Sequence, residues 1–156
     1  MPDIVIDANV WIVADRLIRD GLIKEEENCI KTCRDWLNRF VNSNIRLLVD
    51  WNYQIISEYR KNIRKNGFTE QLLNRLEAES TARLVGVRVE YDKNGHAVLP
   101  EGVFLSDPAD RKYVAAALAS DPNATIFVAT DRGWSQDESQ LGRIGLEIYD
   151  LCPDYN

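Results

Sequence analysis

Hydrophobic and polar residues alternate along this chain in blocks typical of strands followed by helices. Strands are predicted for four short runs rich in apolar residues: 3–7, 46–50, 125–131 and 145–151. Helices are predicted where apolar residues recur at helical spacing: 8–18, 25–42, 52–66, 68–80 and 106–120. This alternation predicts an α/β fold with a central, mostly parallel sheet and helices on both faces, which is a three-layer α/β/α sandwich.

Two local signals refine this prediction. The segment 87–98 alternates apolar and polar residues around Asn94-Gly95, which predicts a β-hairpin insertion with a type I′ turn. Gly67 follows the predicted helix 52–66 and is expected to end it as a C′ glycine. No linker or repeat divides the chain, so residues 1–156 are predicted to form a single domain.

Composition narrows the class of protein. The chain is 45% hydrophobic and 28% charged, which is ordinary for a folded domain. Its apolar runs are too short to span a bilayer and its N-terminus lacks a signal-peptide layout, so we expect a cytoplasmic protein without membrane association. Cys29 and Cys33 are one helical turn apart and are expected to be reduced core residues. The net charge of −6 opposes general electrostatic binding of nucleic acid, unless acids are clustered on divalent cations.

Four carboxylates stand where an α/β fold binds ligands. Asp7 and Asp131 end predicted strands, and ligands of parallel sheets bind outside the carboxyl ends of the strands. Asp110 and Glu58 border the buried sides of their predicted helices, so all four acids could converge. Such a cluster resists joint ionisation without cations, and oxygen ligands suit Mg²⁺ or Mn²⁺.

Each acid also has a purely structural interpretation. Asp107, followed by Pro108 and Asp110, has the arrangement of an N-cap, and capping is the favoured role for Asp107. Asp110 could complement the helix dipole, and Glu58 could be a solvated helix acid. Asp7 and Asp131 could be strand-end turn residues. Only the joint placement of the acids favours a functional site.

Four segments in this order resemble the PIN-domain nucleases: IVIDANV, ISEYR, DPADRKYVAAAL and ATDRGW. The resemblance spans nearly the whole chain, and the DPADRKYVAAAL helix followed by a strand ending ATD is its most specific part. Members of this family cut RNA, and in some branches structured DNA, with Asp and Glu side chains that hold Mg²⁺ or Mn²⁺. Some are toxins of toxin-antitoxin pairs, so an antitoxin or other protein partner and a homodimer are assemblies to consider.

The resemblance assigns roles residue by residue. Asp7 matches the acid of the first strand, Glu58 the central helix acid, Asp110 the helix-start acid and Asp131 the acid after the fourth strand. Asn9 matches a polar position beside the first acid. These matches imply an endoribonuclease in which Mg²⁺, bridged by Asp7 and Asp110, activates water to hydrolyse the phosphodiester. Whether one or two ions bind stays open.

Other side chains have weaker claims. Four basic residues of the predicted helix could contact the substrate backbone, although a solvated basic face is the favoured interpretation: Arg60, Lys61, Arg64 and Lys65. Three tryptophans could stack bases, but packing is the favoured interpretation: Trp11, Trp51 and Trp134. His96, the only histidine, is expected to be a solvated hairpin residue, and this excludes a ribonuclease with paired histidines.

Two rival classes remain at this point. A catalytically inactive PIN-like module would bind RNA or protein without metal, but the presence of all four acids opposes it. An aspartate-nucleophile phosphatase or a phosphotransfer receiver would also place acids at strand ends. The first strand, however, lacks the Asp-x-Asp of such a phosphatase, and no lysine follows a strand as a receiver requires.

Overall fold

The computed structural model describes residues 3–130 and 132–155, and these form an α/β fold around one parallel sheet. The five strands are β1 (Ile4–Ile6), β2 (Leu47–Asp50), β3 (Leu84–Val87), β4 (Thr125–Val128) and β5 (Ile148–Asp150). Their order is β3-β2-β1-β4-β5, and every pair is parallel. The chain therefore starts at the centre of the sheet, builds one side and then the other.

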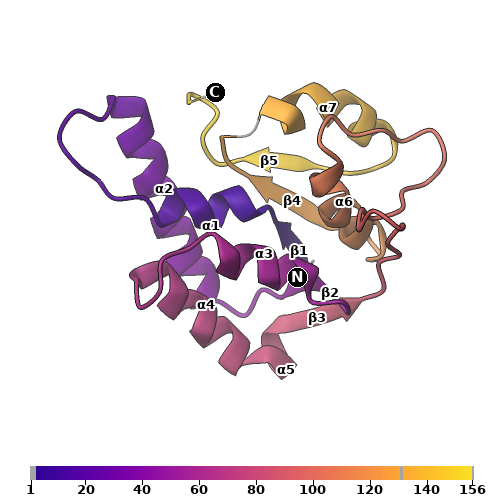
Figure 1. Cartoon of the computed structure of the whole chain (residues 1–156), viewed down its shortest axis with the longest axis horizontal. Coiled ribbons are helices and arrows are strands. Elements are labelled where there is room, and N and C mark those ends of the chain that lie inside the picture. The colour runs from indigo at the N-terminus through magenta and orange to yellow at the C-terminus, as the bar shows by residue number, and fades with distance from the viewer. Residues whose placement is uncertain (1–2, 131, 156) are drawn as a thin grey trace.

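Seven α-helices connect these strands in the described part of the chain. They are α1 (Ala8–Ala14), α2 (Lys24–Val41), α3 (Gln54–Lys61), α4 (Phe68–Ala78), α5 (Ser80–Arg83), α6 (Arg111–Leu118) and α7 (Arg132–Arg143), and the short 3-10 turn η1 (Pro108–Asp110) leads into α6. Figure 1 shows α2 and α4 gathered on the left of the view and α6 and α7 on the right, with the sheet between them. The arrangement is consistent with a three-layer α/β/α sandwich.

The core forms where the apolar helix faces meet the sheet. Val5 and Ile6 of the central strand are completely buried, as expected for a strand covered on both faces. Trp11 of α1 packs on Tyr59 of α3, with ring centroids 5.2 Å apart. The buried Arg83 donates hydrogen bonds to the carbonyls of Phe40, Val41 and Ile45 at 2.7, 2.7 and 3.0 Å, because the end of α2 leaves carbonyls without helical partners.

The helix predicted at 52–66 is shorter in the structure. It ends at Lys61, and Gly67 is the N-cap of α4 instead of the C′ residue of the preceding helix. Asn62 provides the early end, because its side chain donates to the carbonyl of Glu58 at 3.0 Å and competes with the backbone for that acceptor. The prediction that Lys61 and Lys65 lie on one helix is therefore wrong.

The segment predicted as a hairpin turns back on itself without forming strands. Tyr91 and Ala97 form one isolated antiparallel bridge, and the amide of Asp92 donates to the carbonyl of His96 at 2.8 Å. Gly95 has φ of 78°, but Asn94 is absent from the positive-φ residues, so the turn is not type I′. The bonds instead match a three-residue loop in which glycine takes the left-handed position.

The cysteines also differ from the expectation. Cys29 forms a disulfide with Cys152, whereas Cys33 is a buried free thiol, so only Cys33 matches the predicted reduced core residue. Sequence spacing could not indicate this pair, because 123 residues separate the two cysteines. Within residues 3–130 and 132–155, none of the helices combines the length and apolar composition that a membrane span requires.

Candidate functional site

Asp7 lies directly after the central strand and is almost fully buried, with 2% of its surface exposed. Its amide donates to the carbonyl of Phe127 in β4 at 2.9 Å, and its carboxylate accepts a hydrogen bond from the amide of Asn9 at 3.3 Å as the N-cap of α1. The direction of chain growth through the sheet reverses between β1 and β4. Asp7 therefore lies at the topological switch point, where open α/β sheets bind their ligands.

Glu58 reaches the same edge of the sheet from α3. The hydroxyl of the neighbouring Tyr59 donates to the carbonyl of Ile6 at 2.5 Å and so holds α3 against the end of β1. The Glu58 carboxylate accepts hydrogen bonds from the Tyr113 hydroxyl and from Lys112 Nζ, the latter at 3.2 Å. These contacts join α3 to the first turn of α6.

Two buried tyrosines, Tyr59 and Tyr113, lie near the acids. Burial raises the pKa of Tyr113 well above its ordinary value, and the negative charges of Asp7 and Glu58 raise it further. Burial and the same two charges also raise the pKa of Tyr59. The Tyr59 hydroxyl donates to the carbonyl of Ile6, next to Asp7, whereas the Tyr113 hydroxyl donates to Glu58.

Asp110 is half-buried at the N-cap of α6, immediately after η1. Because Lys112 and Tyr113 of the same turn contact Glu58, the start of α6 lies on the Glu58 side of the site. Asp107 is exposed and accepts a hydrogen bond from the amide of Ala109 at 2.9 Å, so its predicted capping role is confirmed. The prediction for Asp131 lies outside the described residues.

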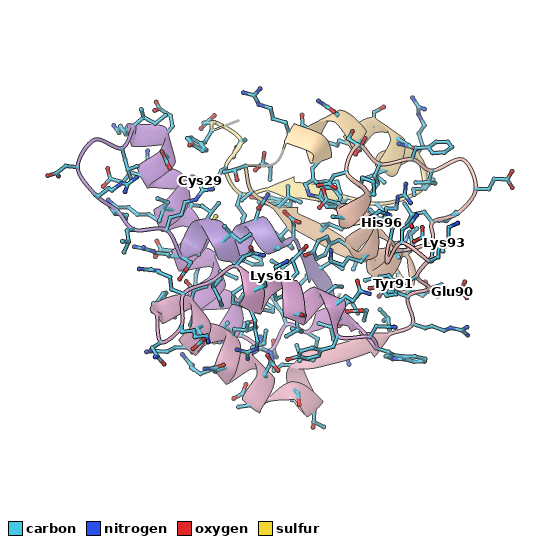
Figure 2. The ribbon with its side chains drawn as sticks, in the orientation of Figure 1. Cys29, Lys61, Glu90, Tyr91, Lys93 and His96 are labelled. Atoms are coloured by element: carbon cyan, nitrogen blue, oxygen red, sulfur yellow. A yellow bond between two sulfur atoms is a disulfide. The ribbon has the colours of Figure 1, made fainter. Side chains whose placement is uncertain are left out.

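An open pocket of about 470 Å³ adjoins Glu58. Its lining is mostly polar and comes from the loop before α3, from α3 itself and from Lys112. Lys61 lies in this lining, and Figure 2 labels it near the end of α3. The pocket thus presents one acid and two ammonium groups to a ligand that approaches the carboxylates.

The other basic candidates have different surroundings. The guanidinium of Arg60 bonds the Glu77 carboxylate at 2.9 and 2.5 Å, and Arg64 bonds Asp15 through both its amide and its side chain, at 2.8 and 3.3 Å. Lys65 is exposed beyond the end of α3. Lys61 is therefore the best placed of the four to meet a ligand at Glu58.

The tryptophans and the histidine that were considered as candidates differ in how exposed their side chains are. Trp11 and Trp134 are buried at 0% and 2% exposure, which confirms packing for these two. Trp51 is 70% exposed and follows β2 directly. His96 is half-buried on the turn of 87–98, where Figure 2 labels it beside Tyr91.

Sequence reasoning missed three residues that shape this site. Asp50, a buried acid at the end of β2, accepts hydrogen bonds from the amides of Gln54 and Ile55 at 3.0 and 2.9 Å and from the Tyr91 hydroxyl at 2.8 Å, so its role is structural. Lys112 is only 8% exposed, and Tyr113 is fully buried. A lysine beside an alanine-rich run is normally solvent-exposed, so periodicity alone could not assign Lys112 to Glu58.

The donor atoms of this site suit a hard divalent cation. Carboxylate oxygens are the ligands that Mg²⁺ and Mn²⁺ prefer, and Asp7 and Glu58 are carboxylates that this edge of the sheet could offer. Lys112 and Tyr113 donate hydrogen bonds to the Glu58 carboxylate, and hydrogen bonds of this kind orient the carboxylates that bind metals in other proteins.

Comparisons with known proteins add no identification. No family model matches the chain, and neither the curated proteins nor the solved structures include a match to it. The functional conclusion consequently depends on the residues and geometry described above.

Proposed function

We propose that this protein is a metal-dependent nuclease with a PIN-like fold, an endoribonuclease whose active site lies at the carboxyl ends of β1 and β4. The observation that carries the proposal is the buried Asp7 carboxylate at the topological switch point. Glu58, held by the buried Lys112, supports the proposal as a second carboxylate whose charge acts on the same tyrosines as that of Asp7.

The residues of the proposed site have different roles in the reaction. Asp7, Asp110, Asp131 and Glu58 would supply oxygen ligands, and Mg²⁺ or Mn²⁺ held there would polarise the scissile phosphate and lower the pKa of the attacking water. Lys112 and Tyr113 hold the Glu58 carboxylate in place. Lys61 lines the adjoining pocket and is positioned to contact a phosphate of the substrate backbone.

The charge of the chain bears on the substrate. With a net charge of −6 and with Arg60 and Arg64 paired to acids, little free basic surface remains around the site. Binding should therefore depend on the divalent cation more than on a basic footprint. A short single-stranded RNA is the substrate class that we expect, with structured DNA the alternative.

The test is a cleavage assay with purified protein on single-stranded RNA, structured RNA and structured DNA, each with Mg²⁺, Mn²⁺ or EDTA. Asp7→Asn is the test variant, because asparagine keeps the cap of α1 and removes the charge. Asp50→Asn is the matched control, since Asp50 is equally buried at a strand end but is occupied by hydrogen bonds to α3 and Tyr91.

We expect cleavage by the wild type with Mg²⁺ or Mn²⁺, loss in EDTA, loss in Asp7→Asn and retention in folded Asp50→Asn. Equal cleavage by wild type and Asp7→Asn would point to a contaminating nuclease and would reject the proposed site. RNA binding without cleavage on every substrate would support the catalytically inactive binding module instead.

A further inference from the structure

Three cysteines from distant parts of the chain meet beneath the C-terminal segment. Cys29 and Cys33 are one turn apart on α2, and Cys152 follows β5. Their sulfur atoms all lie within 4.8 Å of one another, and all three residues are buried. Cys29 and Cys152 form the disulfide, and Cys33 Sγ is 3.8 Å from Cys152 Sγ.

The spacing of these sulfurs matches a thiolate metal site. Two sulfurs bound to one tetrahedral Zn²⁺ at about 2.3 Å lie about 3.8 Å from each other. Cys33 and Cys152 already have this separation, at 3.8 Å. The Cα atoms of Cys29 and Cys152 are 5.4 Å apart, so rotation of the side chains can separate these two sulfurs once their bond is reduced.

We propose that the reduced protein binds a borderline-soft divalent cation such as Zn²⁺ through Cys29, Cys33 and Cys152, and that this metal site and the disulfide are alternative states. A dithiol reductant supplies two electrons and two protons, which break the Cys29–Cys152 bond to give two thiols while the reductant becomes a disulfide. Cation binding then displaces the three thiol protons to solvent, and water completes the tetrahedral coordination.

The surroundings give a cation a route to the sulfurs. A pocket of about 460 Å³ is lined by Cys29 and Cys152 together with the acids Glu25 and Asp154. Lys24 also lines this pocket, so its charged side chains sum to about one negative charge, which favours a cation over an anion. Carboxylates in the lining, however, are not needed as ligands in this proposal.

The third cysteine separates a metal site from a simple disulfide. Cys33 is buried and is not part of the disulfide, yet its Sγ atom is 3.8 Å from Cys152 Sγ. A thiol that coordinates a metal is deprotonated by the metal itself. The proposal therefore gives Cys33 the role of third ligand in the reduced, metal-bound state.

The site is distinct from the carboxylate cluster in both ligands and position. Figure 2 shows Cys29 and Lys61 well apart in the view, and Mg²⁺ does not favour thiolate ligands. In either state the cysteines tie the segment after β5 to α2, and the amide of Leu151 in that segment donates to the carbonyl of Val128 at 2.9 Å. Cellular redox conditions would thus select which crosslink holds the C-terminal segment.

The test is a Co²⁺ titration of the full chain, reduced with a phosphine and desalted without oxygen, with ultraviolet detection of sulfur-to-cobalt charge transfer and Zn²⁺ as competitor. We expect one Co²⁺ per reduced chain, displaced by Zn²⁺ but not by Mg²⁺, and no such absorption from the oxidised chain. Cys33→Ala keeps Cys29 and Cys152 but removes one proposed ligand. Loss of a residue that only hydrogen-bonds a metal ligand weakens metal binding roughly 10- to 100-fold, so loss of the Cys33 ligand itself should weaken Co²⁺ binding by more than this.

Circular dichroism of each variant, and Cys33→Ser as a second variant, separate loss of a ligand from loss of folding. The proposal is overturned if the reduced wild type gives no charge-transfer band, or if folded Cys33→Ala and Cys33→Ser bind Co²⁺ as tightly as the wild type. Asp7→Asn should leave the band unchanged, so failure of the thiolate site and failure of the nuclease proposal are distinguishable.

Discussion

Asp7→Asn should uncouple the stability of the protein from magnesium without damaging the fold. The Asp7 carboxylate is 2% exposed, and holding a charge at such a position costs several kcal/mol unless it is compensated. Asparagine caps a helix about as well as aspartate, so the cap of α1 should change by only a few tenths of a kcal/mol. We therefore expect the variant in EDTA to stay folded, with a midpoint close to that of the wild type.

Magnesium should stabilise the wild type more than the variant. A ligand at 100 times its Kd stabilises the folded state by about 2.7 kcal/mol. For a chain of 156 residues, each kcal/mol raises the midpoint by about 2–4 °C, so the wild type should gain about 5–11 °C at magnesium saturation. Asp7→Asn should gain little, because one of the proposed oxygen ligands loses its charge.

Thermal unfolding followed by circular dichroism, with EDTA or a magnesium series, measures both effects. Asp50→Asn is again the control: it weakens the hydrogen bonds that Asp50 accepts from Gln54, Ile55 and Tyr91, so its midpoint should fall while its magnesium response persists. A wild type whose midpoint ignores magnesium would refute the reasoning, and so would an equal rise in Asp7→Asn.

Three further predictions concern the groups around the site and the core. Lys112→Met should lower the free energy of unfolding by about 1 kcal/mol, because its partner Glu58 is 30% exposed and solvent partly screens the pair. A double-mutant cycle with Glu58→Gln, measured by urea unfolding, should give a coupling energy of about 0.5–1 kcal/mol. A coupling energy of zero would show that the ion pair does not stabilise the protein. Tyr59 and Tyr113 have raised pKa values in the folded protein, so their contribution to stability is complete below about pH 10 and is lost as the pH rises further. The free energy of unfolding in urea should therefore decline from about pH 9 to about pH 11, and Tyr59→Phe and Tyr113→Phe should each make this decline shallower. An unchanged decline in both variants would contradict the prediction. Arg83→Met should cost about 3 kcal/mol or more, because three backbone carbonyls lose a charged donor, and a loss under about 1 kcal/mol in urea would show that water replaces it.

Most strands of the fold could be predicted from the pattern of apolar residues along the sequence. Each predicted strand, at 3–7, 46–50, 125–131 and 145–151, contains a strand of the structure, because a buried parallel strand leaves a short continuous apolar run. β3 was not predicted, because the alternation of apolar and polar residues at 87–98, which begins at its last residue, was interpreted as a hairpin. α7 was also missed, because Trp134 and Leu141 are its only large apolar residues and a helical period cannot be recognised from two positions.

The candidate site was predictable only in part. Strand ends and helix faces placed Asp7, Glu58 and Asp110 in the right elements. The same logic cannot distinguish a functional strand-end acid from a structural one, and it did not predict that Asp50 accepts hydrogen bonds from the first two amides of α3. That distinction depends on hydrogen-bond partners across the fold, such as Tyr91, which no local pattern reveals.

The position of β1 has a consequence for the chain during synthesis. β1 is made first, but its partner β4 begins at Thr125, so β1 lacks one neighbour until most of the chain exists. Until then its backbone groups form an unpaired edge, and the amide of Asp7 has no Phe127 carbonyl to bind. A nascent or truncated chain that ends before β4 would thus expose an apolar strand edge that is prone to self-association.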